Sequence, residues 1–424
     1  MTNYHKTILE NGLKIITVPN KENLAVTLLV LVEAGSKYET KEINGLSHFL
    51  EHMCFKGTKN RKTALNISGE LDGIGAAYNA FTSQEYTGYY AKAEFHHLDK
   101  VIDIVSDLYL NPVFNADEIE KEKGVIIEEL NMYEDLPPNK VAELFDELMY
   151  GDQPAGWPIG GKKEIIRELK RDDFLKYRGA HYVAQATTVV LSGNFEEKDA
   201  IKKLEKAFDG MPVSKKFGKV KTVEKQNKPA VLLQHKALDQ THIVVGCRAF
   251  DVFDKRRFAL DVLADALGGG MSSRLFQRVR EKLGAAYYVN ASADYHTDCG
   301  QLTVRAGIDN TKVKIVLRAI LDEINNFTNK KISKEELQRA KNHLSGNLIL
   351  GLETSDAQAV FYGGQEVLTK SVISPQEALE NINKVTAEDI LSVAQYVFKN
   401  DRLNLAIVGP FKDAKEFEYD LRLI

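Results

Sequence analysis

Three residues near the N-terminus have the types and the spacing of a metal site. They are His48, Glu51 and His52, within GLSHFLEHMCFKGT at residues 45–58. In a helix, residues four apart lie one turn above each other, so both imidazoles would point the same way. Two imidazoles on one helical face are half of a tetrahedral zinc site, and Glu51 could hold a water molecule without binding the metal. The sequence predicts one zinc ion per chain, with its third ligand elsewhere.

The third ligand should come from a second element, and an acidic helix ending near residue 134 offers several carboxylates. Glu122 and Glu129 are seven residues apart, which places them two turns apart on one helical face. A catalytic zinc site needs one carboxylate oxygen here and keeps an open position for water. Spacing alone leaves four candidates: Glu122, Glu128, Glu129 and Glu134.

The chain repeats itself at about half its length. Residues 173–195 match residues 389–411 at an offset of 216, and residues 46–58 match residues 260–273 at an offset near 214. A duplication of this length predicts two copies of one domain, which we assign to residues 1–214 and 230–424. The Lys- and Gln-rich residues 215–229 have the composition of a linker.

The second copy lacks the metal ligands of the first. It has Val262, Asp265 and Ala266 where the first copy has its two histidines and Glu51. Neither an apolar side chain nor alanine binds zinc. We therefore expect the first copy to carry the chemistry and the second copy to serve another purpose.

Composition excludes several other classes of protein. A net charge of −4 without a Lys/Arg run gives no support for nucleic-acid binding. No stretch approaches the roughly 18 consecutive apolar residues of a membrane span, and the N-terminus lacks the apolar core of a signal peptide. Three scattered cysteines are too few for a disulfide framework, which predicts a reducing, cytoplasmic location.

These features together resemble the pitrilysin/insulinase family of zinc metallopeptidases, whose motif is the inverted H-x-x-E-H. The resemblance covers the whole chain and is strongest to the short branch that includes the β subunit of mitochondrial processing peptidase and its bacterial relatives. It implies that His48, His52 and Glu129, the last being 77 residues after His52, bind zinc. It also implies that Glu51 is the general base and that Glu122 supports the site.

The resemblance implies two further sets of site residues. Arg280 and Tyr287 would reach the substrate or the oxyanion from the C-terminal half, and Tyr288 is a rival that the spacing disfavours. The strand at residues 76–83, with Asn79, Ala80 and Phe81, would be the substrate-binding edge. An edge strand binds an extended peptide through main-chain hydrogen bonds, with little dependence on the peptide's sequence.

The predicted fold is α+β, with two homologous domains that each have a mixed, mostly antiparallel sheet and helices packed on one face. By resemblance the chain is half of a clamshell, and we expect a homodimer or a heterodimer with a related chain. The predicted function is zinc-dependent endopeptidase activity on extended or unfolded peptides, with Glu51 activating zinc-bound water. Two other classes are considered: a non-catalytic scaffold or partner subunit of a processing-peptidase-like complex, and a metal-dependent binding module without turnover.

Overall fold

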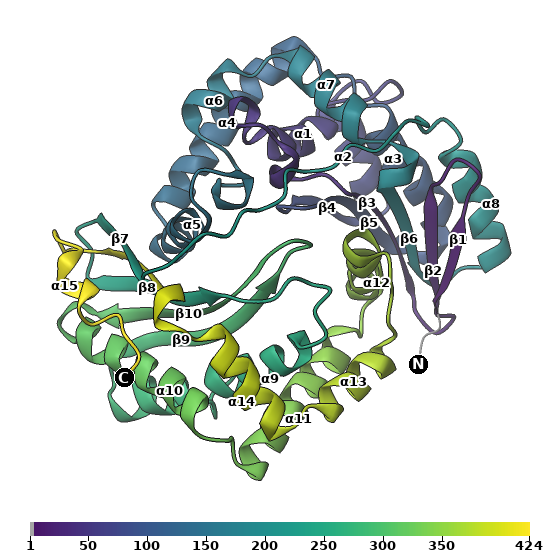
Figure 1. The fold of residues 1–424 in the computed structure, drawn as a ribbon. Helices are drawn as coiled ribbons and strands as arrows, with labels where there is room; N and C mark the ends of the chain where they lie inside the picture. The colour runs from purple at the N-terminus through teal and green to yellow at the C-terminus, as the bar shows by residue number, and fades with distance from the viewer. Residues whose placement is uncertain (1–3) are drawn as a thin grey trace. The chain divides into compact units, whose positions relative to one another are not determined.

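The computed structural model describes residues 4–424, which form two compact units built from three segments each (Figure 1). The first unit comprises the described residues up to Leu130, Pro158–Val220 and Leu350–Ser374. The second unit comprises Asn131–Trp157, Lys221–Ile349 and Pro375–Ile424. These units depart from two contiguous halves, because each contains one segment from the other half of the chain. Within residues 4–424 no helix has the length and apolar character needed to cross a membrane.

The first unit is built on a mixed sheet with the strand order β1-β2-β6-β3-β5-β4. Its strands are β1 (His5–Ile8), β2 (Lys14–Pro19), β3 (Ala25–Val32), β4 (Ala77–Thr82), β5 (Thr87–Glu94) and β6 (Thr187–Gly193). The β2–β6 pair is parallel and the other pairs are antiparallel. Strand β4 is therefore at an edge, with β5 as its neighbour in the sheet.

Helices cover both faces of the first sheet. Its helices are α1 (Leu46–Cys54), α2 (Ala64–Asp72), α3 (Leu98–Leu110), α4 (Ala116–Glu134), α6 (Lys163–Glu168), α7 (Arg171–His181), α8 (Glu197–Ala207) and α12 (Ser355–Thr369). Alternate residues of β3 point to opposite faces, so Leu28 belongs to the core that contains Phe49 of α1, and Leu29 to the core that contains Tyr362 of α12. Strand β3 is consequently a continuous apolar run, as expected for a strand buried on both faces.

The second unit repeats this sheet, with the strand order β7-β11-β8-β10-β9. Its strands are β7 (Ala230–His235), β8 (Gln240–Arg248), β9 (Ala286–Tyr295), β10 (Gly300–Asp309) and β11 (Asn404–Gly409). The β7–β11 pair is parallel and the others are antiparallel, which matches the pattern from β2 to β4 in the first unit. The predicted duplication is therefore visible in the pairing of the strands.

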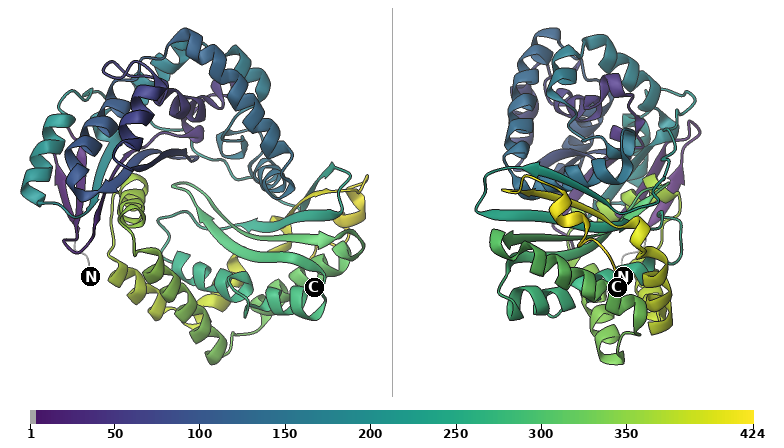
Figure 2. Two further views of the ribbon diagram at one scale, coloured as in Figure 1. Left: turned by 180° about the vertical axis from the view of Figure 1, so that it is seen from behind. Right: turned by 60° about the vertical axis from the view of Figure 1, so that its left-hand side comes forward.

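The second unit has most of its helices on one face of its sheet (Figure 2, left). Its helices are α5 (Pro137–Tyr150), α9 (Arg257–Gly268), α10 (Val313–Asn329), α11 (Lys334–Gly351), α13 (Pro375–Lys384), α14 (Ala387–Val397) and α15 (Lys415–Glu418), with a π-helix at Phe276–Lys282. Helix α5 packs on the opposite face, where Phe145 meets Val244 and Ala406.

The predicted α+β class with two homologous, mostly antiparallel sheets is confirmed. The structure adds one helix on the second face of each sheet, α12 in the first unit and α5 in the second. Tyr362 of α12 and Phe145 of α5 are each at most 1% exposed. Burying a side chain of this size stabilises the folded state by roughly 1.5–3 kcal/mol, so each of these helices is firmly part of its unit.

Candidate metal centre

Helix α1 carries the two histidines on the face turned away from its apolar side. Phe49, Leu50 and Met53 are at most 1% exposed and anchor the helix in the core of the first unit. His48 and His52 lie four residues apart on the other side, with 14% and 21% of their side chains exposed. Their ring centroids are 4.7 Å apart, so the two imidazoles are neighbours as the helical spacing predicts.

Helix α4 brings Glu129 between the two imidazoles. The His48 Nε2 atom is 3.6 Å from Glu129 Oε1, and the His52 Nε2 atom is 3.4 Å from Glu129 Oε2. One ligand atom from each of the three residues lies within 4.8 Å of the others. Zinc bonds of about 2.0–2.2 Å in a tetrahedron would separate ligand atoms by about 3.3–3.6 Å, which matches the two nitrogen–oxygen distances. Two imidazoles and one carboxylate therefore fit zinc in chemistry, and each imidazole lies at zinc spacing from one of the two carboxylate oxygens.

Glu122 is buried and contacts the His52 ring on the side away from Nε2. Its Oε1 is 2.9 Å from His52 Nδ1, and its Oε2 accepts a hydrogen bond from Lys56 Nζ at 2.6 Å. Burial raises the pKa of Glu122, but the bonds from His52 and Lys56 outweigh that effect and hold the pKa below its ordinary value. A carboxylate that accepts the Nδ1 proton of a histidine leaves the Nε2 lone pair free for a metal. Spacing alone did not distinguish Glu122 from Glu129, whereas the geometry gives them different positions.

Glu51 lies beside the histidines, and its carboxylate is held by a residue of another element. Thr82, the last residue of β4, donates a hydrogen bond from its hydroxyl to Glu51 Oε2 at 2.6 Å. Burial raises the pKa of Glu51, and the bond from Thr82 and the two nearby histidines only partly offset the rise. A mostly buried carboxylate beside three ligand-type side chains is placed to accept and release a proton. Thr82 was not predicted, because no sequence pattern links it to residue 51.

The predicted substrate strand lies at the sheet edge. Asn79, Ala80 and Phe81 are in the middle of β4, and their partners across the ladder are on β5. The Ala80 backbone N–H donates to Asn79 Oδ1 at 2.9 Å, so this amide is occupied by the chain's own side chain. The Thr82 hydroxyl joins the end of the same strand to Glu51. The edge position is thus a structural fact, and the binding of substrate there stays a prediction.

Arg280 and Tyr287 belong to the second unit and lie near each other. The Arg280 guanidinium is 5.9 Å from the centroid of the Tyr287 ring, and Tyr287 is 74% exposed. Tyr288 is different, because its hydroxyl is 3.0 Å from His242 Nδ1 and burial raises its pKa to about 12. Tyr288 is therefore committed to packing within its own unit, whereas Tyr287 projects into solvent.

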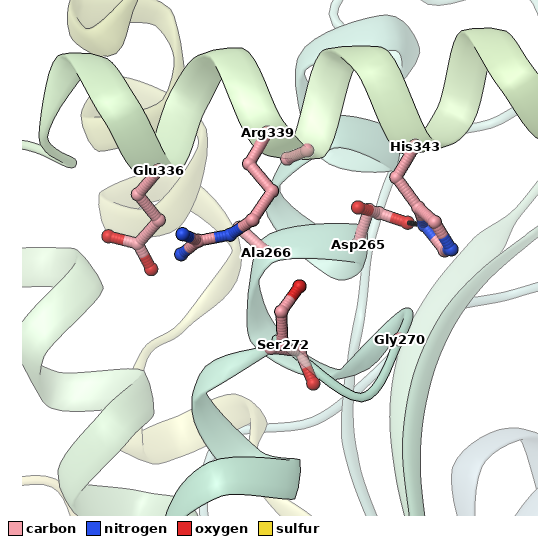
Figure 3. Close-up of a pocket in the computed structure, with 9 residues that line it drawn as sticks. Asp265, Ala266, Gly270, Ser272, Glu336, Arg339 and His343 are labelled. Atoms are coloured by element: carbon pink, nitrogen blue, oxygen red, sulfur yellow. Dashed lines mark hydrogen bonds and ion pairs between the residues drawn. The ribbon is translucent and has the colours of Figure 1, made fainter.

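The second unit has a pocket at the position that corresponds to the metal cluster (Figure 3). Asp265 on α9 and His343 on α11 follow Glu51 and Glu129 by 214 residues each. Their side chains contact each other directly, with His343 Nδ1 2.6 Å from Asp265 Oδ1. Among residues 4–424 the cluster of His48, His52 and Glu129 is the one group of three or more ligand-type side chains with metal spacing.

Comparison with known proteins also distinguishes the part of the chain that carries the metal-type cluster from the part that follows it. The model of the Insulinase (Peptidase family M16) family matches residues 14–163, and the model of the Peptidase M16 inactive domain matches residues 168–344. A protein of Streptomyces coelicolor named an uncharacterized zinc protease is 34% identical over 417 residues, covering 96% of this chain and 90% of that protein. One of the same description from Bacillus subtilis is 34% identical over 402 residues, covering 95% and 97%.

Two solved structures have the same fold. One is a protease from Helicobacter pylori, with a TM-score of 0.89 and 22% identity, which covers 96% of this chain and 100% of that chain. The other is a peptidase M16 inactive domain from Pseudomonas fluorescens, with a TM-score of 0.89 and 17% identity, which covers 97% and 99%. The family models and the relatives place the chain in a family of peptidases with the inverted motif, and the fold and the metal-type cluster agree with that placement. The chain belongs to the insulinase family, peptidase family M16, as the motif predicted; the narrower likeness to the processing-peptidase branch stays a prediction.

Proposed function

We propose that this chain is a zinc-dependent endopeptidase that hydrolyses peptide bonds in extended or unfolded peptides. One observation carries the proposal: ligand atoms of His48, His52 and Glu129 converge within 4.8 Å, with the carboxylate of Glu51 beside them. The names of the relatives, which call them zinc proteases, support the choice of metal. All the residues of this cluster lie within residues 14–163, the part matched by the Insulinase model rather than by the inactive-domain model.

The residues around the cluster divide the chemistry between them. Zinc bound by the two histidines and Glu129 would polarise a water molecule and the scissile carbonyl group. Glu51 takes a proton from the attacking water and delivers it to the nitrogen of the leaving amine. Thr82 holds one oxygen of Glu51, and Glu122 keeps the proton of His52 on Nδ1.

The substrate is proposed to add as a strand to the free edge of β4. Main-chain groups of Asn79, Ala80 and Phe81 would then pair with the peptide backbone. The Asn79 side chain must first leave the Ala80 N–H, to which it is now bonded. This mode suits peptides that are already extended, because a folded substrate has no free backbone to offer.

Arg280 and Tyr287 are proposed to contact the substrate or the developing oxyanion. The exposure of Tyr287 and its proximity to Arg280 support this role. We further propose that the chain forms half of a clamshell and works as a homodimer or as a heterodimer with a related chain. In light scattering, a single species of 47.5 kDa that is fully active when dilute would contradict the dimer.

The proposed location is the cytoplasm. Cys54, Cys247 and Cys299 are buried, and none of them forms a disulfide within the described part of the chain. Free thiols are usual in a reducing compartment and rare in secreted proteins. Cell fractionation followed by immunoblotting tests this location directly.

The second candidate function is a non-catalytic partner subunit of a processing-peptidase-like complex. The inactive-domain match and the Pseudomonas fluorescens structure favour it. That match, however, covers residues 168–344, whereas the metal-type cluster lies outside this range. A third candidate, a metal-dependent binding module without turnover, needs the cluster but not the Glu51 carboxylate.

The variant Glu51→Gln separates these functions. It should keep one zinc ion per chain but lose peptide cleavage by about 10²–10⁴-fold, because glutamine cannot accept the proton. The measurement is mass spectrometry of the products from an unstructured peptide mixture, with metal analysis of the same preparation. Glu120→Gln, which removes an exposed carboxylate from α4, is the matched control and should leave cleavage unchanged. Wild-type protein that is as inert as Glu51→Gln on this mixture would contradict the enzyme and favour the binding roles.

A further inference from the structure

A buried carboxylate lies at the start of the helix that carries the two histidines. Glu39 is 3% exposed and accepts three hydrogen bonds from residues that follow it in the sequence. Its Oε1 accepts the Ser47 N–H at 2.6 Å, and its Oε2 accepts the Gly45 N–H at 2.8 Å and the Asn44 Nδ2–H at 3.0 Å. Two of these three donors are backbone amides at the first turn of α1.

Helix α1 cannot supply this cap from its own N-terminus. The first amides of any helix have no acceptor within the helix, and a Ser, Thr, Asp or Asn side chain at the N-cap usually accepts one of them. The N-cap here is Gly45, at a φ of +98°. A Cβ added to Gly45 would lie 2.6 Å from the Gly160 carbonyl oxygen and 2.8 Å from Ile166 Cδ1. Backbone conformation and packing therefore exclude the usual capping residues, and the carboxylate of Glu39 takes their place.

The cap lies next to the first metal ligand. Ser47 precedes His48, and its hydroxyl donates to the Tyr177 hydroxyl at 2.8 Å, which in turn donates to the Gly35 carbonyl at 3.1 Å. The backbone and the side chain of Ser47 are thus both fixed by neighbouring elements. Because α1 spans only Leu46–Cys54, a shift or rotation at its start would be carried directly to both imidazoles.

We propose that Glu39 is a positioning residue, which holds α1 in the place where the Nε2 atoms of His48 and His52 meet Glu129. The inference rests on the proposed zinc site but not on peptide cleavage. Zinc ligands must lie within about 0.2 Å of their ideal distances, so a small displacement of the helix lowers affinity. The negative charge of Glu39 also faces the positive end of the helix dipole, which adds to the preference for this position.

The test compares zinc affinity in Glu39→Gln and in the wild-type chain, by competition with a chromophoric chelator at pH 8. This pH is above the value of about 7 to which burial raises the pKa of Glu39, so the wild-type side chain is a carboxylate. Glutamine keeps the size of the side chain but turns an NH₂ group toward one of the donors. We expect zinc to bind about 10–100-fold more weakly, the usual cost of removing a residue that orients the ligands.

Glu42→Gln, which changes an exposed carboxylate in the same segment, is the matched control and should bind zinc like the wild type. Circular dichroism of the metal-free variants shows whether they fold. If Glu39→Gln does not fold, Glu39→Asp takes its place; it keeps the charge but shortens the reach, and we expect at least a fivefold loss of affinity.

The outcomes separate the cap from the proposed function. A folded variant at Glu39 whose zinc affinity is within twofold of wild type overturns the positioning role and leaves a role in stability alone. Wild-type protein that binds zinc tightly but cleaves no peptide contradicts the proposed function, and the affinity comparison still decides the role of Glu39. Wild-type protein without tight zinc binding overturns both.

Discussion

Each unit has a corresponding pair of helices packed on a corresponding sheet, but different side chains connect the two helices of each pair. In the first unit, α1 and α4 meet through His48, His52 and Glu129, a set that fits a metal ion. In the second unit, the corresponding helices α9 and α11 meet through a direct contact of Asp265 with His343. A carboxylate and an imidazole thus occur in both places, with their helices exchanged. Without the two histidines, the second unit has a polar link between these helices but not the metal-type cluster of the first unit.

The helices on the second face of each sheet differ in a similar way. Helix α12 buries Glu366, which is 0% exposed, against the ammonium of Lys6 at 2.8 Å. Helix α5 places Asp146 under the second sheet, where Gln301 donates to it at 3.2 Å and no ion pair to Asp146 is formed within residues 4–424. Burial disfavours the ionised form and raises the pKa of Asp146 to about 7, and the bond from Gln301 and the nearby charge of Arg305 offset only part of the rise. Matching positions in the architecture therefore do not have matching electrostatics.

The largest expected difference between the units is in zinc binding. His52→Ala should lose bound zinc and reduce peptide cleavage by more than about a thousandfold, because the two ligands that remain, His48 and Glu129, are too few to hold the metal. His343→Ala, the matched change in the second unit, should keep one zinc ion per chain. Metal analysis of both purified variants checks this prediction. Loss of zinc from His343→Ala would show that the second unit also binds metal, and would contradict the conclusion that only the first unit has a metal site.

A smaller effect is expected on the pH dependence of stability. The folded chain holds the proton of Asp146 more tightly than the unfolded chain does, so this residue makes stability fall as pH rises from about 4 to about 7. Asp146→Asn should remove that part of the decline and raise stability at pH 8 by roughly 2–4 kcal/mol relative to wild type. Urea unfolding at several pH values measures it.

Glu147→Gln, on the exposed side of the same helix, is the control and should keep the wild-type pH dependence. An Asp146→Asn variant whose stability follows the wild-type curve at every pH would show that this acid is not held in its neutral form.

The smallest expected effect concerns the link between α9 and α11. Asp265→Asn should lower the free energy of unfolding by only about 1 kcal/mol, because His343 is 40% exposed and water replaces part of the contact. Removing zinc from the wild-type chain should cost more, about 4 kcal/mol when free zinc is a thousand times its dissociation constant. Thermal unfolding of Asp265→Asn, and of the wild-type chain with and without a chelator, compares the two effects. Equal effects would mean that the direct pair joins its helices as strongly as the metal does.

Local patterns in the sequence were sufficient for much of the fold and the site. The four-residue spacing of His48 and His52 fixed their common face, because helical geometry depends on near neighbours. The offset of 214–216 residues predicted two copies of one domain, and the strand pairing of the two sheets repeats as expected. Glu129 needed the family resemblance, since spacing left four carboxylates open.

Only the tertiary structure revealed the positions of Glu39, Thr82 and Lys56 around the site. It also showed that α5, from the first half of the sequence, belongs to the second unit, and that α12, from the second half, belongs to the first unit. The apolar stripe of a helix shows that it must be buried, but not which sheet will cover it. That choice depends on complementary surfaces formed by residues far apart in the chain, such as Phe145 with Val244 and Tyr362 with Leu29. Hydrogen bonds to Glu51 and Ser47 likewise come from residues brought near by packing, so no spacing in the sequence could indicate them.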